Sequence, residues 1–128
     1  MVGSSGRIAG EVLSELHRQL ETLGRQDVAG ASLNSYGAVL VVSDLSTAMD
    51  VANRIAPEHL ELHVQDPFSL MGMIQNAGAV FMGDFTPEPV GDYMAGPNHV
   101  LPTAGTARYA SALSVDHFIK KTSLLHYS

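Results

Sequence analysis

The chain has 128 residues and a formal net charge of −6, with only 7 lysines and arginines and no cysteine. The acidic balance argues against sequence-independent nucleic-acid binding, which needs a basic surface, and the lack of cysteine excludes disulfides and thiolate chemistry. A hydrophobic share of 45% is typical of a globular chain of this length with one core. No membrane-spanning run and no signal peptide is recognised, so we expect a cytoplasmic protein that does not bind membranes.

The first segments predict a flexible leader followed by a helix. Residues 1–6 are small and carry little apolar surface, so we expect a leader before a single domain over residues 7–128. Between residues 7 and 23, apolar side chains recur at intervals of three and four, as on one face of an amphipathic helix. This apolar stripe consists of Ile8, Val12, Leu16, Leu20 and Leu23.

A strand and a helix are predicted next. The continuous apolar run at residues 37–42 is typical of a strand buried on both faces, as in a parallel sheet covered by helices. Asp44 or Ser46 can cap the helix that follows, and Pro57 ends it because proline cannot continue a helix.

A second unit of the same kind follows directly. Residues 60–65 alternate between apolar and polar side chains, which indicates a strand with one solvated face. Asp66-Pro67 favours the start of a short helix, and the apolar residues 79–82 predict a third strand. The order of strands and helices predicts a layered α/β domain with a mainly parallel sheet.

The last part of the chain is less regular. Residues 83–106 are rich in glycine and proline but contain apolar anchors, so we expect an ordered loop with a short helix near Glu88. A final helix is predicted from Ser114 or Asp116 through Lys121, and residues 123–127 could form an edge strand.

Glu58 and His59 form the first candidate site, at the junction between a helix and a strand. An imidazole can accept a proton near neutral pH, and a neighbouring carboxylate can activate water. The same pair is also compatible with an ordinary loop in which both groups are solvated or bonded to backbone. His59 and His63 are unsuited to sharing one metal ion, because four residues of strand span roughly 13 Å.

The loop at residues 91–99 is the second candidate site. Asp92 and His99 have side chains suited to a divalent metal or a polar substrate. A loop held together by its own local hydrogen bonds would have the same composition. No glycine-rich phosphate-binding motif is present.

These segments together resemble histidinol dehydrogenase. The similarity is carried by residues 53–62 (NRIAPEHLEL), 76–81 (NAGAVF) and 91–103 (GDYMAGPNHVLPT), and it continues through residues 105–108 and 111–123. The resemblance implies oxidation of L-histidinol through histidinaldehyde to L-histidine in histidine biosynthesis, with NAD and zinc as cofactors. It also implies a homodimer.

The resemblance implies a role for each candidate residue. His59 resembles the general base that removes the alcohol proton and acts again at the aldehyde stage. Glu58 resembles the base that activates water. Asp92 resembles a zinc ligand that also contacts substrate, and His99 resembles a substrate-contacting imidazole. No cofactor-binding residue can be assigned.

The chain also departs from the family pattern. Family members are several times longer, and their zinc site uses a Gln-x-x-His pair that is absent here, together with residues of the partner subunit. We therefore expect one domain of the enzyme, with a three-layer, incomplete Rossmann-like fold, that is inactive and zinc-free in isolation. The alternative is a non-catalytic truncated paralogue that serves as a binding or self-association module.

Overall fold

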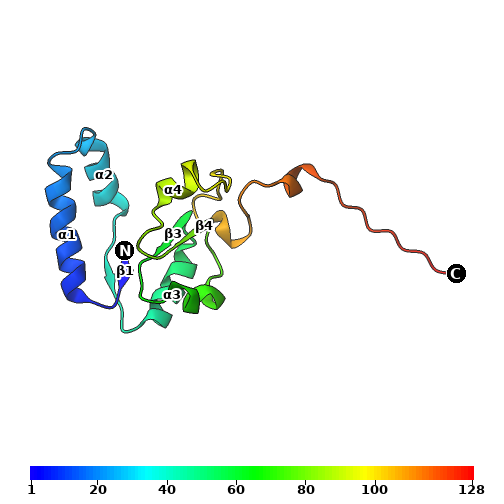
Figure 1. The fold of residues 1–128 in the computed structure, drawn as a ribbon, viewed down its shortest axis with the longest axis horizontal. Helices are drawn as coiled ribbons and strands as arrows, with labels where there is room; N and C mark the ends of the chain where they lie inside the picture. Colours follow the sequence, from blue (N-terminus) through cyan, green and yellow to red (C-terminus); the bar gives the residue numbers. More distant parts are fainter. The chain divides into compact units, whose positions relative to one another are not determined.

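The computed structural model describes residues 1–128, which divide into two compact units, residues 1–52 and 53–128 (Figure 1). The units contain short parallel strand pairs and helices, which confirms the predicted α/β class. None of the helices combines the length and the apolar character needed to cross a membrane.

The first unit joins two short strands to a pair of helices. Strand β1 (Val2–Gly3) pairs in parallel with β2 (Leu40–Val41). Between them lie α1 (Gly6–Leu20) and α2 (Gln26–Tyr36), which contact each other. The Ser5 hydroxyl caps α1 by accepting a hydrogen bond from the Ile8 amide at 3.3 Å.

The beginning of the chain differs from the flexible leader predicted by its composition. The Met1 carbonyl accepts a hydrogen bond from the Leu40 amide at 3.0 Å, and the Gly3 carbonyl accepts one from Val42 at 2.9 Å. Strand pairing uses backbone groups, so it does not require a continuous apolar run at this position. Val2 and Gly3 are therefore part of a strand pair.

Strand β2 is shorter and more exposed than its sequence predicts. Leu40 and Val41 are 40% and 55% exposed, whereas an uninterrupted apolar run predicts burial on both faces. Burial needs a covering layer, and periodicity does not say whether the same chain supplies it.

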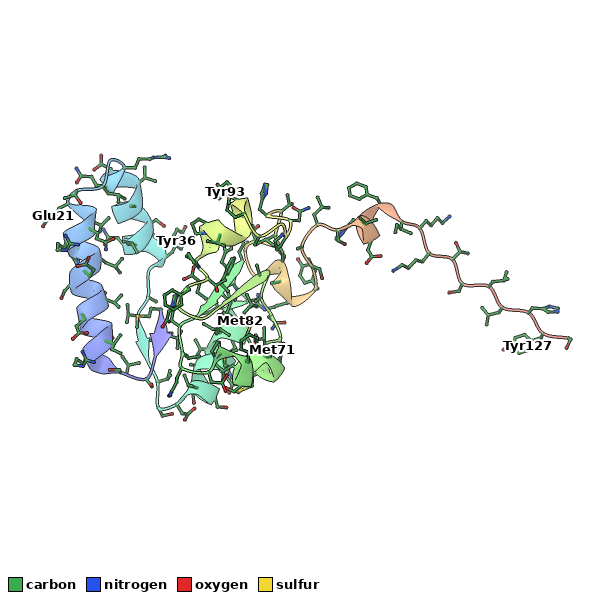
Figure 2. The ribbon with its side chains drawn as sticks, viewed as in Figure 1. Glu21, Tyr36, Met71, Met82, Tyr93 and Tyr127 are labelled. Atoms are coloured by element: carbon green, nitrogen blue, oxygen red, sulfur yellow. The ribbon has the colours of Figure 1, made fainter.

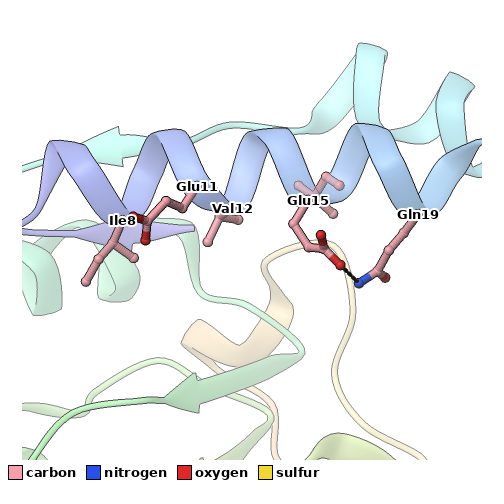
Figure 3. Close-up of a pocket in the computed structure, with 6 residues that line it drawn as sticks. Ile8, Glu11, Val12, Glu15 and Gln19 are labelled. Atoms are coloured by element: carbon pink, nitrogen blue, oxygen red, sulfur yellow. Dashed lines mark hydrogen bonds between the residues drawn. The ribbon is translucent and has the colours of Figure 1, made fainter.

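One face of α1 is also open. The predicted stripe residues Ile8, Val12 and Leu16 line a shallow hollow together with Glu11, Glu15 and Gln19 (Figure 3). The Gln19 amide donates a hydrogen bond to Glu15 at 2.8 Å within this hollow. The helix is thus amphipathic as predicted, and its apolar face is only partly covered.

Helix α3 (Leu45–Ile55) leads to the junction that precedes the first candidate site. The Asp44 carboxylate accepts a hydrogen bond from the Thr47 amide at 2.7 Å, which confirms Asp44 as the cap. The helix ends at Ile55, and Ala56 then adopts a left-handed conformation with φ 52° directly before Pro57. The predicted stop at proline is thereby confirmed.

The second unit is built on a parallel strand pair. Strand β3 (His59–Leu62) pairs with β4 (Ala79–Met82), with His59 opposite Ala79 and Leu62 opposite Met82. The connection contains the 3₁₀ helix η1 (Pro67–Met73), which Asp66 caps through the Ser69 amide at 3.3 Å. The core of this unit consists of Ala56, Leu62, Leu70, Phe81 and Ala107.

Asn53 fastens the connection between η1 and β4. Its side chain donates to the Met73 carbonyl at 2.8 Å and accepts from the amides of Gln75 and Asn76 at 2.8 and 3.2 Å. These bonds satisfy a buried polar side chain. They also fix the position of residues 73–76, which lead from η1 into β4.

The rest of the unit contains short helical segments. Helix α4 (Glu88–Tyr93) confirms the predicted short helix, and 3₁₀ turns follow at η2 (Thr106–Arg108) and η3 (Val115–Phe118). Tyr93, at the end of α4, is largely exposed (Figure 2).

Two predictions for the end of the chain are wrong. The last helix is the four-residue η3 instead of a run through Lys121, and residues 119–128 contain neither helix nor strand. Residues 123–127 are exposed and pair with no strand, whereas an edge strand requires a neighbouring strand; Tyr127 is labelled in Figure 2.

Candidate functional site

The backbone of Glu58 and His59 is held tightly where β3 begins. The Pro57 carbonyl accepts a hydrogen bond from the Gly78 amide at 3.0 Å, and the Glu58 carbonyl accepts one from Ala79 at 2.8 Å. The junction therefore has a defined geometry, set by the start of β4.

Gly78 makes this close approach possible. A Cβ atom placed on Gly78 would lie 2.6 Å from the Glu58 carbonyl oxygen and 3.2 Å from Cδ of Pro102. Neither the backbone carbonyl nor the proline ring can rotate out of the way, so a side chain here would displace the junction.

His59 is directed towards acidic groups. Its ring lies against Phe81, with centroids 5.8 Å apart and an interplanar angle of 42°. Its Nε2 atom is buried without a hydrogen-bond partner and lies 4.0 Å from Oε1 of Glu88. The imidazole is therefore braced on an apolar face while one nitrogen is available for proton transfer or coordination.

Helix α4 supplies the carboxylates that face His59. Glu88 and Asp92 are four residues apart, so they lie on the same side of the helix. Ligand atoms of His59, Glu88 and Asp92 all lie within 4.8 Å of one another. A hydrogen bond with Asp92, together with burial, raises the pKa of Glu88. We call His59, Glu88 and Asp92 the acid–imidazole cluster.

The donors of this cluster fit a divalent cation such as zinc. Zinc takes imidazole nitrogen and carboxylate oxygen, and a catalytic zinc site keeps a position for substrate. The unpartnered Nε2 of His59 and the close carboxylates of Glu88 and Asp92 supply that donor chemistry.

The structure brings together only some of the predicted site residues. His59 and Asp92 meet in the acid–imidazole cluster, and the half-buried Glu58 directly precedes His59. His99 lies exposed in the loop after α4 and is not part of the cluster. That loop is shaped in part by Asn98, whose side chain accepts a hydrogen bond from the Val100 amide at 2.8 Å.

Glu88 is a site residue that the sequence patterns identified only as a helix start. Its spacing of four residues from Asp92, on a helix, was a signal that could have paired the two carboxylates. Spacing does not predict that these carboxylates lie close to His59, because Glu88 and His59 are 29 positions apart in the chain.

Arg108 makes a long-range contact that the sequence pattern does not predict. Its guanidinium donates hydrogen bonds to the carbonyl of Arg54 and, at 2.7 Å, to that of Gly105. Gly105 has φ 79°, in the left-handed region where glycine is favoured. Arg108 thereby ties the η2 segment to the chain that ends α3, just before the Glu58–His59 pair.

His63 is separate from the cluster, as the strand geometry predicts. Its Nε2 atom lies 2.9 Å from Oε2 of Glu61, and its Nδ1 atom lies 3.3 Å from Oδ1 of Asp84. The hydrogen bond with Glu61 raises the pKa of His63, and the same bond lowers the pKa of Glu61.

Comparison with known proteins places these residues in a family. A sequence model described as histidinol dehydrogenase matches residues 1–128. The chain is 53% identical over its whole length to histidinol dehydrogenase of Caldanaerobacter subterraneus subsp. tengcongensis and 56% identical to that of Geobacillus kaustophilus, and spans 30% of each.

A solved structure shows the same fold. Histidinol dehydrogenase from Elizabethkingia anophelis superposes with a TM-score of 0.88 at 35% sequence identity, over 94% of this chain and 28% of that chain. The matched family model and the relatives agree along the whole sequence, so this chain belongs to the histidinol dehydrogenase family.

Proposed function

We propose that this chain contributes to the NAD-dependent oxidation of L-histidinol, through histidinaldehyde, to L-histidine in histidine biosynthesis. One observation carries the proposal: His59 Nε2 is unpartnered and faces the carboxylates of Glu88 and Asp92 in a chain of this family. Because the chain spans about 30% of its relatives, the activity is proposed for the full-length protein.

His59 is proposed as the general base. Hydride can leave an alcohol carbon only if the attached oxygen loses its proton, and a positioned imidazole is suited to accept that proton. The Phe81 ring braces the imidazole, so Nε2 keeps its orientation between the two oxidation stages. The same nitrogen would serve again when the hydrated aldehyde is oxidised.

Glu58 is proposed to activate the water that attacks the aldehyde. Its backbone is anchored to β4, so its carboxylate extends from a fixed point beside His59. Asp92 is proposed as a zinc ligand that also contacts substrate, and His99 as a substrate-contacting imidazole. When bound, zinc would supply a positive centre that orients the imidazole and amine of histidinol, and NAD would accept the hydrides.

The proposed site is incomplete within this chain. The remaining zinc ligands and the NAD contacts are proposed to lie in other parts of the enzyme, including a partner subunit of a homodimer. We therefore propose that the isolated chain is inactive and does not retain zinc.

Self-association is the second candidate function. It is favoured by apolar side chains that remain exposed on short elements, such as Leu40 and Val41 of β2 and Val90 of α4. Calorimetric titration of the full-length protein with histidinol and zinc separates the two candidates. Binding heat supports a site that recognises substrate, and association without any binding heat supports a self-association module.

Separate substitutions of Glu58 and His59 in the full-length protein test the proposal. We expect His59→Asn to slow both oxidations by roughly 10²- to 10⁴-fold, because each needs the same base. Glu58→Gln should spare the first hydride transfer and slow the second, which requires activated water. Single-turnover NADH formation then gives one NADH per histidinol in a burst instead of two.

Glu21→Gln provides the control, because Glu21 is an exposed carboxylate at the end of α1. Its NADH yield should equal that of the wild type. A wild-type protein that does not reduce NAD with histidinol would refute the proposed function. Equal slowing of both hydride transfers in Glu58→Gln would refute the assigned role of Glu58.

A further inference from the structure

Glu61 connects β3 to the start of α4. Its Oε1 atom accepts a hydrogen bond from the Glu88 amide at 3.1 Å, and Glu88 is the first residue of α4. The residue before the helix, Pro87, makes no side-chain cap. A carboxylate from a neighbouring strand thus satisfies an amide that the helix itself leaves unpaired.

The location of this bond matters because α4 is only six residues long. Such a short helix has little stability of its own and depends on contacts with the rest of the unit. Glu88 lies at its first position and Asp92 one turn later, so anchoring the Glu88 amide also places both carboxylates.

Strand alternation puts Glu61 on the same side of β3 as the proposed base. Side chains two residues apart on a strand share a face, so Glu61 and His59 point to the same side. The face of β3 on which His59 lies near Glu88 therefore also carries the Glu61 carboxylate, which accepts the hydrogen bond from the Glu88 amide. A single residue of β3, Leu60, separates Glu61 from His59.

Glu61 is itself held in place by a second bond. Its other oxygen, Oε2, lies 2.9 Å from Nε2 of His63, and Nδ1 of His63 lies 3.3 Å from Asp84. One oxygen of Glu61 thus bonds to the Glu88 amide of α4, and the other bonds to the imidazole of His63. This arrangement restricts the rotation of a side chain that would otherwise be free at the surface.

We propose that Glu61 is a positioning residue for histidinol oxidation: its hydrogen bond to the Glu88 amide holds α4 so that Glu88 and Asp92 face His59. The inference rests on the proposed function. It assigns no chemical step to Glu61, which acts through the backbone of α4. His63 supports Glu61 by occupying its second oxygen.

A pair of substitutions in the full-length protein tests this role. Glu61→Ala removes the acceptor, so we expect kcat for histidinol to fall by roughly 10- to 100-fold, the usual effect of losing a supporting contact. Glu61→Gln keeps a carbonyl oxygen for the Glu88 amide and should restore most of the activity. Hydrogen exchange should become faster at the Glu88 amide in Glu61→Ala and remain slow in Glu61→Gln.

Asp66→Ala is the matched control, because Asp66 also caps a short helix by accepting from a backbone amide, that of Ser69. It should accelerate exchange at Ser69 and leave kcat unchanged. Unchanged kcat in Glu61→Ala, unchanged exchange at Glu88, or a Gln variant as impaired as the Ala variant would each overturn the inference. A wild-type protein that does not oxidise histidinol overturns the proposed function instead. Exchange at the Glu88 amide reports on the hydrogen bond from Glu61 independently of activity, so the two failures can be distinguished.

Discussion

His59 shows how a single side chain can be both structurally constrained and chemically available. Its ring packs on Phe81, while Nε2 is buried without a partner. Leaving a buried polar atom unpaired costs on the order of 1–3 kcal/mol, so folding alone does not favour this arrangement. A group that binds beside Glu88 and Asp92 would satisfy the nitrogen, which is consistent with a role in chemistry.

His63 provides a residue-scale prediction that does not depend on catalysis. Its hydrogen bond to Glu61 raises its pKa above the ordinary value of 6.5. The resulting contribution to the free energy of unfolding is therefore present in full below about pH 6.5 and is lost as pH rises through the folded-state pKa. Half of the side chain is exposed, so we expect less than about 1 kcal/mol.

The titration of the His63 ring, followed by NMR, checks this expectation. Glu61→Gln removes the charge that stabilises the protonated ring, so the pKa of His63 should fall in that variant. Glu21→Gln removes an exposed carboxylate at the end of α1, which is not among the groups that shift the pKa of His63, and should leave the titration unaltered. A His63 pKa that is the same in wild type and Glu61→Gln would contradict the ion pair.

At the scale of elements, the junction between α3 and β3 depends on the close approach of β4. Gly78→Ala places a methyl group against the Glu58 carbonyl and Pro102, neither of which can move freely. Overpacking of this kind costs about 1–3 kcal/mol, so we expect a lower free energy of unfolding by that amount. Chemical denaturation of the isolated chain measures it.

Gly72→Ala is the matched control for Gly78→Ala. Gly72 lies in η1, and a Cβ atom there would meet no other atom within 4 Å. The same methyl group should therefore leave stability nearly unchanged. If both variants unfold at the same denaturant concentration, the close approach at Gly78 is not what shapes the junction.

Elements that depend on local signals could be predicted well. Asp44 caps α3, Pro57 follows its end, and the apolar run at residues 79–82 forms β4 with the predicted bounds. The predicted length of the last helix and the predicted edge strand at residues 123–127 were wrong. Pattern alone cannot show whether a partner strand or a covering layer exists.

At the scale of the whole molecule, the exposed apolar surface and the length of the relatives point to the same conclusion. The apolar face of α1 is only partly covered, Leu40 and Val41 of β2 are exposed, and the chain spans about 30% of the length of the curated relatives. Exposed apolar surface on this scale marks sites that contact other protein surfaces. We expect such contacts in the full-length enzyme.

The isolated chain should therefore show neither turnover nor stable zinc binding. Within the acid–imidazole cluster, only Asp92 is proposed as a zinc ligand, because His59 is assigned to proton transfer. The chain alone therefore lacks the full set of ligands that a stable zinc site needs. Incubation with histidinol and NAD should give no NADH, and zinc should be removed by dialysis. The full-length protein, treated identically, is the positive control, and stoichiometric zinc with NADH production from the isolated chain would contradict this expectation.

Much of the candidate site could be predicted from the residues, but its assembly could not. Glu58, His59, Asp92 and His99 were candidates because their residue types suit proton transfer and the binding of a metal or a polar substrate. His99 lies outside the acid–imidazole cluster. Glu61 and Glu88 were not assigned to the site, because their roles depend on a hydrogen bond between residues 27 positions apart.

The sequence by itself determined where α3 and β4 lie and which side chains are candidates for the proposed chemistry, because caps, stops and periodicity act within one or two turns of chain. Only the tertiary structure decided that Nε2 of His59 faces Glu88 at 4.0 Å and that Glu61 holds the helix that carries Glu88. These distances follow from the pairing of β3 with β4 and the contact between Glu61 and α4. No local pattern encodes such contacts between segments distant in the chain.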